Sequence, residues 1–139
     1  MLDHGMLLPI IALVGWTFVM WFWMYATRIP AMQRARIDMA ELSRTGAPLV
    51  LPPEIARVAD NYNHLHEQPT TFYAVALVAQ LAGGVDATLV GLAWAYVGLR
   101  VVHSLVQATR NVIPIRFAVF TLGSLVLMVI WLRTLLQLL

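Results

Sequence analysis

The sequence predicts an all-α integral membrane protein whose four membrane-spanning helices pack as a bundle. Of its 139 residues, 60% are apolar and only 12% are charged, whereas a soluble domain carries about twice as much charge. The mean hydropathy is +0.76. Apolar stretches that match a ~30 Å bilayer core recur along the chain, so we expect one domain over residues 1–139. The expected spans are residues 6–26, 54–82, 86–109 and 115–136.

The first span is expected to stay in the protein rather than to be cleaved as a signal peptide. It has no basic residue before it, and its apolar run is too long for a signal-peptide core. It ends at Arg28 after a run of aromatic residues, which is typical of a membrane interface.

Residues 28–53 form the longest polar stretch and are predicted to be a loop outside the bilayer. Within it, residues 31–43 suit a short interfacial helix that the segment 45–48 ends. Pro52 and Pro53 then open the next helix, because a proline in the first turn loses no helical hydrogen bond.

The predicted helix 54–82 has a polar first half and an apolar second half, with a kink expected at Pro69. Its polar residues share one face roughly 120° wide. They are Arg57, Asp60, Asn61, His64, Glu67 and Gln68. Polar groups that enter a membrane are costly, so the stripe predicts a functional site. The alternative, to which we give equal weight, is an ion-pair network that only fixes helix packing.

A tight turn at residues 83–86 makes the helices on either side of it antiparallel neighbours. Glu67 and Arg100 then lie at the same depth, about 21–22 Å from the turn, and are predicted to form an ion pair. Removing one member of such a buried pair costs ~3–5 kcal/mol. By the same count His64 lies level with His103.

Two more pairs continue this register toward the second turn, residues 110–114. Asn61 is level with Gln107, and Arg57 with Arg110. At the mouth of the site, Arg116 and Arg28 are candidates to bind a carboxylate or to stabilise an anion. The alternative is that these arginines only anchor the protein at the membrane interface, and the sequence favours this alternative more for Arg28 than for Arg116.

Composition excludes several kinds of chemistry. The chain has no cysteine, so any thiol must come from a ligand. No basic cluster lies outside the membrane-flanking loops, which argues against nucleic-acid binding. His64, Glu67 and His103 are residue types that can bind iron or zinc, but Arg100 competes for Glu67, so no metal is predicted.

Arginine counts predict the orientation. The loops 28–53 and 110–114 and their flanks carry most of the arginines, whereas Arg133 is the one arginine at the opposite ends of the spans. The positive-inside rule places these two loops in the cytoplasm and both termini on the other side.

Three segments resemble the MAPEG family, the membrane-associated proteins in eicosanoid and glutathione metabolism. They are Ala59–Tyr73 with the motif ADNYNHLHEQP, Ala93–Ser104 with LRVVHS, and Ile115–Phe117. The similarity covers about residues 52–135 and is greatest to the bacterial branch, which implies a bacterial inner membrane with periplasmic termini. It implies a four-helix bundle that forms a homotrimer with sites between subunits.

The resemblance also implies a function. Family enzymes bind glutathione as a co-substrate near the cytoplasmic side, an arginine that begins the last helix stabilises its thiolate, and lipophilic small molecules arrive from the bilayer lipids. Arg116 matches that catalytic arginine. Glu67, Arg100 and His103 also stand at matching positions, and Arg28 matches an arginine of the first helix. Together with Asn61, His64 and Gln107 from the polar faces, these are the candidate ligand-binding residues. The expected activity is that of a glutathione-dependent transferase or peroxidase.

This chain departs from the glutathione-binding members at several positions. Asp60 stands where they carry arginine and His64 where they carry asparagine, while Gln107, Phe117 and Phe120 replace tyrosines. An acid in place of an arginine disfavours an anionic tripeptide in the same pose. The alternative is therefore a non-catalytic membrane scaffold or an accessory subunit of a larger membrane complex.

Overall fold

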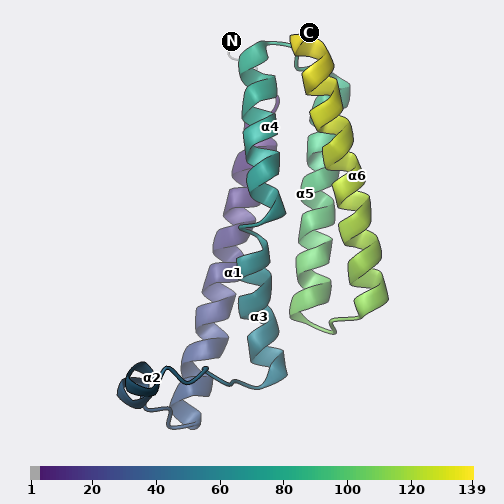
Figure 1. Cartoon of the computed structure of the whole chain (residues 1–139). Helices are drawn as coiled ribbons and strands as arrows, with labels where there is room; N and C mark the ends of the chain where they lie inside the picture. The colour runs from purple at the N-terminus through teal and green to yellow at the C-terminus, as the bar shows by residue number, and fades with distance from the viewer. Residues whose placement is uncertain (1–3) are drawn as a thin grey trace.

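The computed structural model describes residues 4–139, and the first three residues of the predicted domain lie outside it. This part of the chain is all-α (Figure 1). The helices are α1 (Leu7–Arg34), α2 (Met39–Thr45), α3 (Pro53–His64), α4 (Gln68–Ala82), α5 (Ala87–Ala108) and α6 (Ile113–Leu138). Of these, α1, α5 and α6 are long and apolar enough to cross a membrane.

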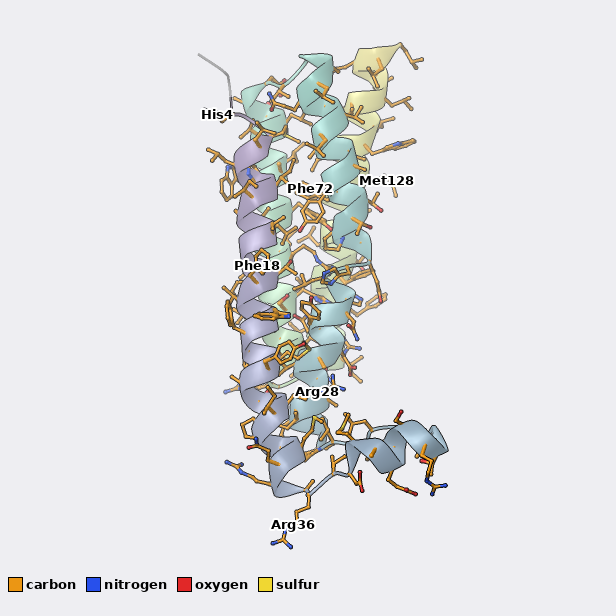
Figure 2. All side chains as sticks on the ribbon, turned by 90° about the vertical axis from the view of Figure 1, so that its left-hand side faces the viewer. His4, Phe18, Arg28, Arg36, Phe72 and Met128 are labelled. Atoms are coloured by element: carbon orange, nitrogen blue, oxygen red, sulfur yellow. The ribbon has the colours of Figure 1, made fainter. Side chains whose placement is uncertain are left out.

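The helices α3 and α4 follow one another along α1, and α5 and α6 form an antiparallel pair beside them (Figure 1). His4 and the C-terminus lie at the end of the molecule opposite to α2 (Figures 1 and 2). Apolar side chains line the interior. They include Leu13, Met20, Phe72, Tyr96 and Ile130, each with 0% of its surface exposed. Many large apolar side chains on α1, α5 and α6 point outward instead, as lipid-facing helices require.

The prediction of one helix over residues 54–82 is wrong. The chain leaves helical geometry after His64 and resumes it at Gln68, with Glu67 at φ −93° and ψ −98°. Pro69 explains the break, because its ring lacks an N–H and clashes with the carbonyl four residues earlier, that of Leu65. The proline therefore lies in the first turn of a new helix, where it is tolerated.

The boundaries near residues 28–53 also differ from the prediction. The first helix continues through Pro30 to Arg34, and the chain turns at Arg36 with a φ of 49°. The short helix predicted over 31–43 forms instead at Met39–Thr45, because the Asp38 carboxylate accepts hydrogen bonds from the first free backbone N–H groups. Gly46 ends it in the left-handed conformation, as the predicted break at 45–48 requires.

The turn between α4 and α5 is tied to the end of α6. Gly83 adopts a φ of 74°, the Asp86 carboxylate accepts from the backbone N–H of Leu89 at 2.7 Å, and Arg133 donates to its other oxygen at 2.7 Å. Gln137 donates to the carbonyl of Gly84 at 2.6 Å. These bonds hold the turn between α4 and α5 against the end of α6.

This clamp predicts a loss of stability in acid. The Leu89 N–H and the Arg133 guanidinium lower the pKa of Asp86 below its ordinary value. A lowered pKa stabilises the fold fully above the unfolded value of about 4, and that contribution is lost as the pH falls toward the folded value. We expect the Asp86→Asn variant, which keeps a capping oxygen, to show a smaller drop in detergent unfolding midpoint from pH 6 to pH 3. An equal drop in both proteins would contradict the assignment.

Candidate functional site

Polar side chains of α3 and α5 meet in the interior at the predicted register. The rings of His64 and His103 stack with centroids 5.1 Å apart and planes 15° apart. One turn away, Asn61 donates to the side-chain oxygen of Gln107 at 2.9 Å, and both residues are buried. Arg57 reaches the end of α5, where it donates to the carbonyl of Thr109 at 2.7 Å. The depth matching inferred from the turn is therefore confirmed.

The predicted ion pair between Glu67 and Arg100 is wrong for the described chain. Arg100 is only 1% exposed, and its guanidinium instead donates to Nδ1 of His64 at 3.1 Å and to the side-chain oxygen of Gln68 at 3.4 Å. The break after His64 turns Glu67 outward, where its side chain is 66% exposed. The ~3–5 kcal/mol cost expected for breaking that pair therefore does not apply.

Arg100 fixes which nitrogen of neutral His64 carries the proton. A guanidinium only donates hydrogen bonds, so Nδ1 of His64 must be the acceptor. The proton of the neutral ring then lies on Nε2, which is 3.6 Å from a carboxylate oxygen of Glu67. Arg100 thus orients the His64 ring and makes Nδ1 the acceptor and Nε2 the donor.

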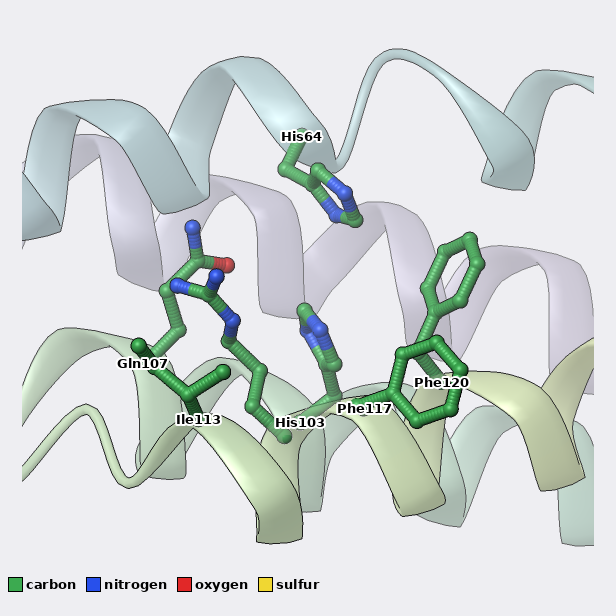
Figure 3. A pocket seen from close by; sticks show the side chains of 7 residues that line it. His64, His103, Gln107, Ile113, Phe117 and Phe120 are labelled. Atoms are coloured by element: carbon green, nitrogen blue, oxygen red, sulfur yellow. The ribbon is translucent and has the colours of Figure 1, made fainter.

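A cavity of about 240 Å³ opens between α3, α5 and α6 next to the two histidines. Its wall combines polar and aromatic side chains (Figure 3). The lining residues are His64, His103, Gln107, Ile113, Arg116, Phe117 and Phe120. The rings of His64 and Phe120 meet edge to face at 5.5 Å, so the polar and apolar halves of the wall are in contact.

Arg116 gives the cavity its positive charge. It lies in the first turn of α6, which holds no acidic residue, and the helix dipole adds to its charge. Its guanidinium donates to the side-chain oxygen of Asn111 at 2.6 Å, and Asn111 is held at a φ of 51°. Within residues 4–139, no carboxylate lies within ion-pair distance of Arg116. The cavity is therefore suited to an anion.

The structure divides the predicted site residues into three groups. His64, His103, Gln107 and Arg116 line the cavity directly. Asn61 and Arg100 lie behind it and position Gln107 and His64, while Glu67 approaches the site only through His64. Arg28, near the end of α1, does not line the cavity. Sequence reasoning missed Ile113 and the Asn111 contact, for which no pattern gave a signal.

Metal binding does not match this arrangement. Arg100 occupies Nδ1 of His64, which leaves that ring one nitrogen for any ligand. In the part of the chain that the structure describes, no three His, Asp or Glu side chains are placed to share an ion. The donor set thus fits an anion better than a cation.

Comparison with known proteins identifies the family. Neither the curated proteins nor the solved structures contain a match to this chain. The model of the MAPEG family matches residues 6–136, nearly the whole sequence, which contain α1, α5 and all of α6 but its last two residues. The chain is therefore an integral membrane protein that belongs to the MAPEG family.

Proposed function

We propose that this protein is a glutathione-dependent transferase or peroxidase that acts on lipophilic electrophiles or lipid hydroperoxides. One observation carries the proposal: Arg116 lines a cavity, lacks a carboxylate partner among the described residues, and lies beside the apolar rings of Phe117 and Phe120. A cation in such a place stabilises a thiolate, and an apolar wall receives the second substrate.

Each polar group has a role in this proposal. When the thiol loses its proton, Arg116 stabilises the sulfur anion by charge and by a donated hydrogen bond. His103 and Gln107 hold polar groups of the tripeptide, and Nε2–H of His64 donates to it. Arg100 and Asn61 act indirectly, because they fix the orientations of His64 and Gln107. The exposed carboxylate of Glu67 suits the ammonium group of the ligand.

The cavity supports a site completed by a neighbouring subunit. Its volume of about 240 Å³ lies below the roughly 300–1,000 Å³ of typical small-molecule sites. A four-helix bundle that assembles as a homotrimer would add the missing wall, to which Arg28 would contribute. In the proposed orientation the loops 28–53 and 110–114 face the cytoplasm of a bacterial inner membrane, and the substrate thiol enters from that side.

A non-catalytic scaffold or subunit of a larger membrane complex is the second candidate. Asp60 is exposed on α3, one turn before the His64 that lines the cavity. A carboxylate there repels the carboxylates of glutathione. This observation favours a different ligand or none.

Calorimetric titration of glutathione into the detergent-purified protein separates the two candidates. The enzyme requires saturable binding that is weakened in Arg116→Gln and retained in Arg34→Gln, a matched change on an exposed arginine at the end of α1. S-methylglutathione should bind more weakly than glutathione, because it has no thiolate. Absence of binding at millimolar glutathione in the wild-type protein would contradict the proposal and leave the scaffold.

A further inference from the structure

A second cavity, of about 180 Å³, lies between α1 and the break that joins α3 to α4. It shares no residue with the first cavity: His64 faces one, and its neighbours Leu65 and His66 face the other. The lining residues are Val14, Thr17, Phe18, Tyr62, Leu65, His66, Thr70 and Tyr73. Phe18, at the outer edge of this cavity, is 60% exposed on the surface of α1 (Figure 2).

The cavity lies level with the middle of the predicted first span, residues 6–26. Thr17 follows the start of α1 by about 15 Å at 1.5 Å per residue, and the hydrocarbon core is ~30 Å thick. Water is scarce at this depth, so a polar atom there needs a partner from protein or ligand.

Three of the polar side chains that line this cavity, His66, Thr70 and Thr17, already donate their protons to backbone carbonyls. Nδ1 of His66 lies 2.9 Å from the carbonyl of Tyr62, so Nδ1 carries the proton and Nε2 of the neutral ring is an acceptor. Thr70 donates its hydroxyl proton to the carbonyl of Glu67 at 2.6 Å, and Thr17 donates to the carbonyl of Leu13 at 3.0 Å. These side chains can therefore only accept from a ligand.

Tyr62 and Tyr73 bring two further hydroxyl groups to the wall. Tyr73 lies in the wall beside Thr17, whose own proton is donated to the carbonyl of Leu13. The rest of the wall is apolar, and it carries no arginine. An anionic head group would therefore find no arginine here to balance its charge.

We propose that this cavity binds an amphiphile whose head group is a hydroxyl donor, an alcohol or phenol, and whose apolar body extends between the helices into lipid. The hydroxyl donates to Nε2 of His66, with Thr70 as the second acceptor. A carboxylate or phosphate is disfavoured, because it offers no proton to Nε2 of His66 and finds no arginine or lysine in the wall. This site is independent of the glutathione proposal.

The test uses protein with nitrogen-15 histidine in lipid nanodiscs and three matched probes: para-nonylphenol, its methyl ether, and para-nonylbenzoate. The His66 signals are identified by their loss in His66→Phe. We expect Nε2 to be unprotonated in the free protein and its resonance to shift saturably with the phenol, but not with the ether or the benzoate. Thr70→Val should weaken phenol binding about fivefold, as expected for one lost hydrogen bond.

Thr71→Val is the matched control, since Thr71 is exposed and does not line the cavity, and it should bind like the wild type. A protonated Nε2 in the free protein would overturn the proposal. The proposal would also be overturned if the ether shifted the resonance as much as the phenol, or if the benzoate bound more strongly. A shift that never saturates would overturn it too, because such a shift reports partitioning into lipid.

Discussion

We expect the replacement of Arg116 by glutamine to lower the rate of thiol addition to a lipophilic electrophile by about 10²- to 10³-fold. The guanidinium lies in a cavity without a carboxylate partner among the described residues, so in the proposed reaction its charge would act directly on the sulfur anion. The loss is measured with glutathione and a chloronitrobenzene, where a carbon–sulfur bond forms and chloride leaves.

Two controls separate this effect from a loss of folding. Arg116→Lys keeps the charge but not the forked geometry that reaches both Asn111 and the ligand, so it should retain more activity than the glutamine variant. Arg34→Gln should behave as the wild type. Equal rates in Arg116→Gln and the wild type would refute the role given to this arginine.

Replacing Phe72 by alanine lowers the free energy of unfolding by about 3 kcal/mol. Phe72 is 0% exposed, and its ring stacks on that of Tyr96 at 4.6 Å, so the substitution leaves a cavity between α4 and α5 (Figure 2). Within a membrane the main loss is that of packing contacts, because lipid offers no hydrophobic driving force between helices. Unfolding in mixed micelles with increasing dodecyl sulfate measures the change.

Phe22→Ala is the matched control for that measurement. The Phe22 side chain is 65% exposed on α1, where lipid replaces it at little cost. We expect this variant to lose less than about 1 kcal/mol. Similar losses in the two variants would mean that α4 does not pack as described.

The sequence predicted the pairing of helices better than their continuity. The tight turn at residues 83–86 and a constant rise per residue sufficed to bring His64 to His103 and Asn61 to Gln107. Such counting depends only on backbone geometry, and the antiparallel arrangement follows from the turn.

The fate of Glu67 could not be predicted in this way. Helical periodicity places it on the same face as His64, but that holds only while the helix is unbroken. A proline either kinks a helix or ends it, and the choice depends on how the neighbouring helices pack. Here the helix ends, so Arg100 binds the side chains of His64 and Gln68 instead.

The cavity itself could not be predicted from the sequence. Its polar lining residues were predicted, but its volume depends on how α3, α5 and α6 pack together, which no local pattern encodes. The contribution of Ile113 and the hydrogen bond from Arg116 to Asn111 arise from the turn between α5 and α6. The role of Arg28 stays a prediction.

The most direct test of the account is the ultraviolet difference spectrum of glutathione mixed with the protein at neutral pH. We predict a thiolate absorbance that rises saturably with the wild-type protein and is absent with Arg116→Gln at the same concentration. An identical spectrum for the two proteins, or no thiolate band with either, would contradict the claim that Arg116 holds a sulfur anion.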